Sequence, residues 1–334
     1  MRSLIAGLFT CVAFLILLEL LFRGMVYINK GSKEDRFLVL PHHRLGWVLN
    51  PQMRPKSITN RCGEVVELIS PPHSLILKYP QGNGKRKIVF LGDSFTHAHE
   101  VSTGKAYFDI FERLEQGNYE VYAVAVGGYG NLQEYLALQE VFDEIEPDIV
   151  AWQLTGNDVS NNVFELDDSS IWNSQRLRPY LNPDNGAIEM RNPGLWMFDW
   201  SDGFAYVFKK LLIIDSRYKL GIIRWLDSIN AMDRDTQEIL EERGLAVLEY
   251  AIREAVSTFP DTTFIGFSVD PQFDRKYEEI FTRNGGSYLP AFYKALNAVD
   301  ATDCRPLDSH WNHTGNQVAG AEFSNRLSEL RADR

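Results

Sequence analysis

Residues 87–96, KIVFLGDSFT, join a short apolar run to a Gly-Asp-Ser turn. A continuous apolar run that ends at a turn is typical of a strand buried on both faces of a parallel sheet. Ser94 therefore follows the carboxyl end of a predicted strand, where open α/β sheets bind their ligands. A serine that only caps the next helix would show the same local pattern. The function of Ser94 therefore depends on which residues accompany it.

Strand-like and helix-like segments alternate along the rest of the chain. Apolar runs predict buried strands at 119–126, 148–154 and 263–269, and helical patterns cover 105–115, 132–145, 234–259 and 313–330. Such alternation is typical of βαβ units around a parallel sheet. The sequence therefore predicts the α/β class, as a three-layer α/β/α sandwich with a parallel sheet formed by residues 85–334.

Two segments depart from this alternation. Residues 29–84 are rich in proline and glycine, and they predict a connector of turns and short strands. Residues 159–232 contain several tryptophans and the turn-like stretch Asn-Pro-Asp-Asn-Gly at 182–186. We expect this second segment to be an insertion over the site, with helices at 205–214 and 218–229.

The N-terminus carries a predicted membrane span. Residues 4–18 contain no charge, and after Glu19 the apolar run resumes, giving about the length that crosses a bilayer core. The residues that follow this apolar span contain no small-residue cleavage site, so residues 1–28 predict an uncleaved single-pass anchor. Arg23, Lys30, Lys33 and Arg36 follow the span, and the positive-inside rule would place the body in the cytoplasm. The signal-like start favours the opposite orientation, and we expect a periplasmic or otherwise extracytoplasmic catalytic domain.

Composition excludes several classes of protein. The net charge of −11 argues against a nucleic-acid partner, because phosphate binding needs a basic surface. The chain has three cysteines and no CxxC pair, which leaves Cys62 and Cys304 either paired or as free thiols. His97 and His99 form an H-x-H motif without a carboxylate or cysteine cluster, so we expect substrate-edge or solvent-facing histidines. No metal or cofactor is expected.

Ser94 has the companions that nucleophilic catalysis requires. A serine hydroxyl needs a neighbouring base, and the base needs a partner that orients it. Asp308-Ser309-His310, just before the last predicted helix, contains both. Gly127-Gly128-Tyr129-Gly130 and Gly156-Asn157-Asp158 each follow a predicted strand and could donate hydrogen bonds to an oxyanion. Position 96 is threonine, so the G-x-S-x-G elbow of α/β-hydrolases is absent.

These motifs, in this order, resemble the four blocks of the SGNH/GDSL hydrolase superfamily over roughly residues 85–330. The resemblance implies that Ser94 is the nucleophile, His310 the base and Asp308 its orienting acid. It also implies an oxyanion hole, formed by Ser94, Gly128 and Asn157. Two positions depart from the family pattern, Leu307 and Ala123. The D-x-H spacing is similar to that of alginate-acetylation-type members.

The expected function is serine-dependent hydrolysis or transfer of an O-acyl group, most simply acetyl, through an acyl-enzyme. The anchor and the D-x-H spacing favour cell-envelope glycans as substrates. The alternatives are an esterase for small esters or lipids and a non-catalytic glycan-binding protein on the same fold. Asp158 competes for the role of the acid, and Ser216-Arg217-Tyr218-Lys219 is a weaker S-x-x-K candidate that fits a surface helix better.

Overall fold

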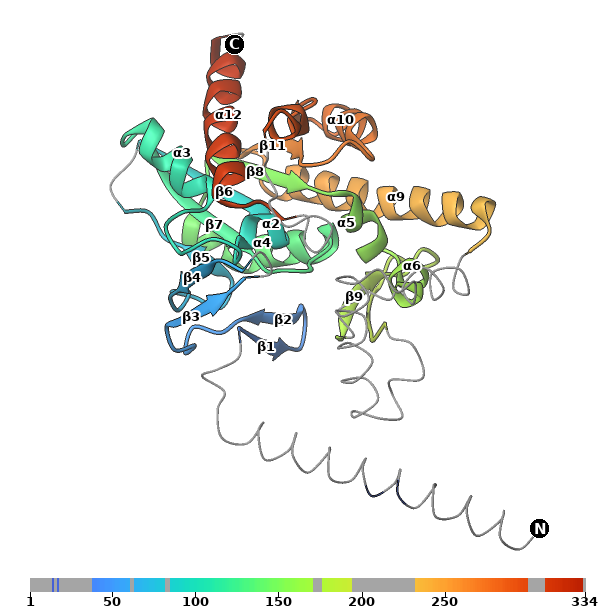
Figure 1. Ribbon diagram of the computed structural model, residues 1–334. Coiled ribbons are helices and arrows are strands. Elements are labelled where there is room, and N and C mark those ends of the chain that lie inside the picture. Colours follow the sequence, from blue (N-terminus) through green and yellow to red (C-terminus); the bar gives the residue numbers. More distant parts are fainter. Residues whose placement is uncertain are drawn as a thin grey trace, which may run out of the picture.

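A six-stranded sheet forms the centre of the protein (Figure 1). The computed structural model describes Phe14, Leu17 and residues 38–60, 63–81, 85–170, 176–193, 232–299 and 310–332. The strand order is β12-β11-β8-β6-β7-β5. Pairing is parallel throughout, except that β5 runs antiparallel to β7. The strand bounds are β5 Ile76–Lys78, β6 Arg86–Gly92, β7 Tyr119–Ala125, β8 Ile149–Leu154, β11 Thr263–Ser268 and β12 Ser287–Leu289.

The predicted strand before Ser94 is β6, and both of its faces are buried. Val89 and Leu91 belong to one hydrophobic cluster, whereas Ile88 and Phe90 belong to the cluster on the opposite face. Successive side chains of a strand point to opposite faces, so a strand covered on both sides is apolar at every position. This arrangement explains the unbroken apolar run in the sequence.

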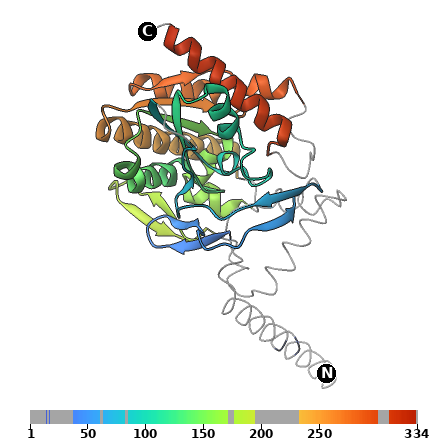
Figure 2. The same cartoon turned by 90° about the vertical axis from the view of Figure 1, so that its left-hand side faces the viewer.

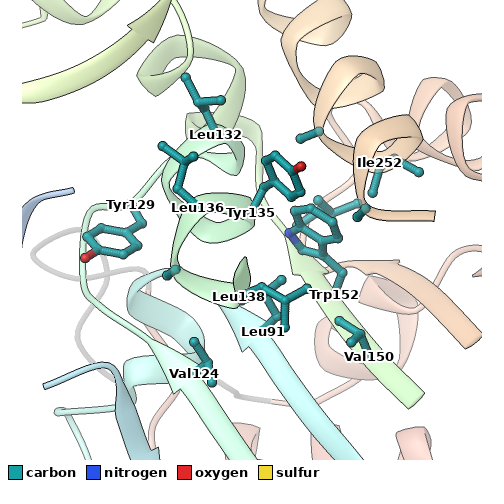
Figure 3. Packing of buried hydrophobic residues seen from close by; sticks show 14 of the residues in the cluster. Leu91, Val124, Tyr129, Leu132, Tyr135, Leu136, Leu138, Val150, Trp152 and Ile252 are labelled. Atoms are coloured by element: carbon teal, nitrogen blue, oxygen red, sulfur yellow. The ribbon is translucent and has the colours of Figure 1, made fainter. Parts of the chain in front are cut away.

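Helices cover both faces of the sheet, which makes the protein a three-layer α/β/α sandwich, as predicted (Figure 2). Figure 3 shows Leu91, Val150 and Trp152 packed beneath residues of α4, next to Ile252 of α9. This face is covered by α4 Asn131–Ile145, α9 Arg234–Thr258 and α10 Asp274–Arg283. The other face is covered by α3 Tyr107–Glu115, α11 Tyr293–Asn297 and α12 His313–Ala332.

Residues 38–81 pack onto the sandwich. They form the hairpins β1 Val39–His42 with β2 Gly46–Leu49, and β3 Lys56–Thr59 with β4 Val65–Leu68, followed by the edge strand β5. Trp47 of β2 is only 1% exposed and belongs to the main core cluster. The segment expected to be a connector therefore contributes a strand to the sheet and side chains to the core.

The described parts of the expected insertion pack against α4 and α9. They comprise α5 Gly156–Asn161, α6 Phe164–Ser169 and a hairpin of β9 Arg178–Leu181 and β10 Ile188–Arg191, closed by the predicted turn at 182–186. Arg178, which is 1% exposed, donates to Gln133 of α4 at 2.8 Å and pairs with Asp167 at 3.0 Å. The helices expected at 205–214 and 218–229 lie outside the described residues.

The predicted membrane span lies almost wholly outside the described residues as well. Phe14 and Leu17 are helical and exposed. Across the part of the chain that the structure describes, no helix combines the length and the apolar character that crossing a bilayer requires. Cys62 and Cys304 also lie outside it.

Candidate active site

Ser94 is the first residue of the short helix α2 Ser94–His97, directly after β6 and Asp93. Asp93 caps this helix, because its Oδ1 accepts a hydrogen bond from the Phe95 backbone N–H at 3.0 Å. Its Oδ2 accepts from Ser94 Oγ at 3.2 Å. A Cβ at Gly92 would lie 2.5 Å from Gln153 Oε1 and from Thr96 Oγ1, so this tight turn needs glycine. The half-buried Ser94 is therefore held at the carboxyl end of the sheet.

His310 meets Ser94 across 216 residues of sequence. Its Nε2 lies 2.7 Å from Ser94 Oγ, within hydrogen-bond reach of the proton that a base must remove. His310 lies three residues before α12, and its ring packs on Phe95 of α2 with 4.9 Å between ring centres. The structure therefore brings together the predicted nucleophile and the predicted base. Asp308 lies outside the described residues, and its role stays a prediction.

The carboxylate of Glu100 lies near His310 and was not anticipated from the sequence. Glu100 Oε1 is 3.5 Å from His310 Nδ1 and 3.1 Å from His99 Nε2. The residue is 7% exposed, and the Glu100 backbone carbonyl accepts from Asn60 Nδ2 at 3.0 Å. A carboxylate at this distance favours the protonated imidazole. In the sequence, Glu100 is one acidic residue in a loop, without a motif that distinguishes it.

Asn157 is held next to Asp93 by hydrogen bonds at both ends of its amide. Its Oδ1 accepts from the Thr155 hydroxyl, and its Nδ2 donates to Asp93 Oδ2 at 3.3 Å. The bond to Thr155 sets which end of the amide is the donor. Because Asp93 Oδ2 also accepts from Ser94, the amide donor lies next to the nucleophile, as an oxyanion donor must.

The backbone at Gly127, next to Gly128, also borders the nucleophile. A Cβ at Gly127 would lie 3.3 Å from His97 Nδ1 and 3.8 Å from Ser94 Cβ. The Gly127 carbonyl accepts from Trp47 Nε1 at 3.2 Å, and the Gly127 N–H donates to His97 Nδ1 at 3.1 Å. Gly128 has φ +82°, a conformation that favours glycine. The Gly127 N–H is thus already engaged, which leaves Gly128 as the better donor of the two.

His97 lies beside the nucleophile and also makes a structural contact that the sequence did not predict. It is half-buried, and Nδ1 is an acceptor for the Gly127 N–H. Burial, followed by the nearby His99 and His310 rings, lowers the pKa of His97 to about 3. The ring is therefore neutral near pH 7, and it holds the glycine turn in place. Within the described ranges, no three His, Cys, Asp or Glu side chains are grouped so that they could hold a metal ion.

Asp158, the competing candidate for the acid, is fully buried and hydrogen-bonded elsewhere. Its Oδ2 accepts from the Thr155 backbone N–H at 2.8 Å and from Asn131 Nδ2 at 3.2 Å. Asn131 Nδ2 also donates to Glu134 at 3.0 Å. Burial, then the charges of Glu134 and Asp93, raise the pKa of Asp158 well above its usual range. Asp158 therefore caps α5 and joins it to α4.

The solved structures with which this chain can be aligned include esterases. The chain aligns with TesA at TM-score 0.43 and 11% identity, over 73% of this chain and 99% of that one. It aligns with the psychrotrophic esterase EstA from Pseudoalteromonas sp. at TM-score 0.41 and 9% identity, over 74% and 100%. A catalytic mutant of the acetylxylan esterase Axe2 from Geobacillus stearothermophilus aligns at TM-score 0.37 and 13% identity, over 74% and 96%.

No protein-family profile and no curated protein sequence matches the chain. The similarities to solved structures are too low to assign an activity. The function must therefore come from the chemistry of the site itself.

Proposed function

We propose that the protein is a serine-dependent esterase that works through an acyl-enzyme. The observation that carries this proposal is the 2.7 Å contact between Ser94 Oγ and His310 Nε2, at the carboxyl end of a parallel sheet. A serine paired with an imidazole in this geometry is an activated nucleophile. Asn157 Nδ2 shares Asp93 Oδ2 with the Ser94 hydroxyl, and Gly128 follows Gly127, whose backbone borders Ser94, so both are candidate oxyanion donors.

In this mechanism, Ser94 Oγ attacks the ester carbonyl carbon while His310 Nε2 takes the hydroxyl proton. The carbonyl oxygen becomes an oxyanion, and the donors of Ser94, Gly128 and Asn157 stabilise it. One such donor is worth about 10²–10³ in rate. His310 then returns the proton to the leaving alcohol, and the acyl group stays on Ser94. A water molecule or another hydroxyl then attacks the acyl carbon while His310 takes its proton. The bond to Ser94 breaks, His310 returns the proton to Ser94 Oγ, and the acyl group is released.

The nature of the acceptor separates a hydrolase from a transferase. Water yields a free acid, whereas a sugar hydroxyl yields a new ester from the same acyl-enzyme. The D-x-H spacing and the predicted anchor support a cell-envelope glycan as the alcohol that donates or accepts the acyl group. These two features come from the sequence, and small or lipid esters remain the competing substrate class.

A direct assay tests the proposed activity. Detergent-solubilised full-length protein should release p-nitrophenol from p-nitrophenyl acetate, with the Ser94→Ala protein as background. If the enzyme is a transferase, an added polysaccharide acceptor should receive the acetyl group. If the enzyme is a hydrolase, the acceptor should not change the amount of free acetate that is released. If the wild-type protein released p-nitrophenol no faster than the Ser94→Ala protein, whichever ester was offered, the result would contradict an esterase.

The orientation of the chain decides whether envelope glycans are accessible. We propose that the catalytic body is exported, because the uncharged run at 4–18 without a small-residue cleavage site after it is typical of an uncleaved signal anchor. Alkaline phosphatase fused after Arg334 should then be active. An inactive fusion, together with a fluorescent cytoplasmic-type reporter at the same position, would place the body inside and remove mature envelope polymers as substrates.

A further inference from the structure

A cavity of about 350 Å³ lies beside the candidate active site. One side is formed by the packed N-terminal segment, including Leu49, Met53 and Leu68. The other side is formed by the loop that follows α2 and by the start of α3, including Val101 and Phe108. Its volume falls in the range of pockets that hold small molecules.

The lining of this cavity is predominantly apolar. Leucine, isoleucine, methionine, valine, phenylalanine, proline and alanine make up more than half of its lining residues. The one lysine among its lining residues, Lys78, pairs with Asp109 at 2.9 Å and with Glu112 at 2.9 Å. The lysine charge is thus compensated by protein carboxylates. A cavity with this lining suits an uncharged aliphatic group better than a sugar or a phosphate, which would lose hydrogen bonds to water.

The cavity begins one helical turn from the nucleophile. His97, Ala98 and His99 line it, and the Ala98 N–H donates to the Ser94 carbonyl at 3.0 Å. The His99 ring centre lies 6.3 Å from that of His310. A Cβ added at Gly127 would lie within 4 Å of both His97 Nδ1 and Ser94 Cβ. The two imidazoles therefore form a wall shared by the cavity and the catalytic groups.

We propose that this cavity binds the aliphatic chain of the acyl group, so that the preferred substrate is an ester of a medium-length fatty acid. This inference rests on the proposed esterase function and defines its substrate class. An acyl chain attached at Ser94 would lie past His97 and His99 with its distal carbons between Met53 and Phe108. An acetyl group is too short to extend from Ser94 into this space, so the cavity favours a longer chain over acetyl.

A chain-length series tests the proposal. For p-nitrophenyl esters from acetyl to octanoyl, kcat/KM should rise by several-fold per added methylene until the cavity is filled, since each buried methylene contributes about 0.8 kcal/mol, or about fourfold. The measurement uses the full-length protein in a detergent that does not compete for the cavity, with substrate kept below its solubility limit.

Two matched variants distinguish the cavity from the surface around it. Ile69, which follows β4 and is 59% exposed, lines the cavity, so Ile69→Trp should narrow its mouth. We expect kcat/KM for the octanoyl ester to fall at least about tenfold and that for the acetyl ester to stay within about twofold. Val65, which is 67% exposed on β4, is not among the lining residues, and Val65→Trp should change neither value. Both side chains are exposed, so melting temperatures should stay near that of the wild type.

The outcomes separate this proposal from the proposed function. An acetyl ester that is turned over as well as the octanoyl ester, or an Ile69→Trp protein that loses both equally, would overturn the acyl cavity and leave the esterase intact. Calorimetric titration of the Ser94→Ala protein gives a readout without turnover. Octanoyl ester should bind more tightly than acetyl ester, and Ile69→Trp in that background should remove the difference. Equal binding of the two esters would also overturn the proposal.

Discussion

Replacing Ser94 with alanine is expected to abolish ester turnover, by up to about 10⁶-fold in kcat, the scale seen when a serine hydrolase loses its nucleophile. The Ser94 hydroxyl contacts Asp93 Oδ2 and His310 Nε2, and alanine removes both contacts without adding volume. Release of p-nitrophenol under saturating substrate measures the effect. The melting temperature should change little, because the side chain is small and half-buried.

Covalent labelling identifies the nucleophile independently of the rate. A serine-directed phosphonate should modify the wild-type protein once, at Ser94, and should leave the Ser94→Ala protein unmodified. Peptide mass spectrometry locates the adduct. An adduct at Ser216, the alternative serine of the S-x-x-K stretch, would show that the assignment is wrong.

Asp308→Asn is expected to have the second-largest effect, on the order of 10³–10⁴-fold in kcat. The amide would favour the wrong tautomer of His310, and Nε2 would then carry a proton instead of accepting one from Ser94. The protein should stay folded, since asparagine has nearly the same shape as aspartate. Initial rates with the best ester of the chain-length series measure the loss.

Glu100→Gln is the matched control for Asp308→Asn, because it neutralises the carboxylate that the structure places near His310. The 3.5 Å contact is longer than a hydrogen bond, so we expect about a tenfold loss. A near-wild-type Asp308→Asn protein, together with an inactive Glu100→Gln protein, would assign the orienting role to Glu100.

The strand and helix pattern was largely predictable from the sequence. Strands β6, β7, β8 and β11 and helices α3, α4, α9 and α12 lie within two residues of the predicted bounds. Each is an apolar run or a periodic segment long enough to show which of its faces are buried. The shorter elements β12 and α11, with three and five residues, and the more polar helix α10 were not predicted.

The N-terminal segment shows why local composition misleads. Its prolines and glycines predict turns, and the two hairpins do contain turns. Pairing of β5 with β7 and burial of Trp47, however, depend on partners far along the chain. A segment of this composition shows no periodicity that would reveal such contacts before the partners are placed.

The sequence by itself determined the α/β class and the edge of the sheet where Ser94, Gly128 and Asn157 gather. Strand periodicity and βα order decide both, and both are local properties of the chain. Only the tertiary structure placed His310 on Ser94, brought Glu100 to the same imidazole and turned His97 toward Gly127. It also created the apolar cavity between residues 38–81 and the loop after α2. These features depend on contacts between segments distant in sequence, which packing decides and which no short motif records.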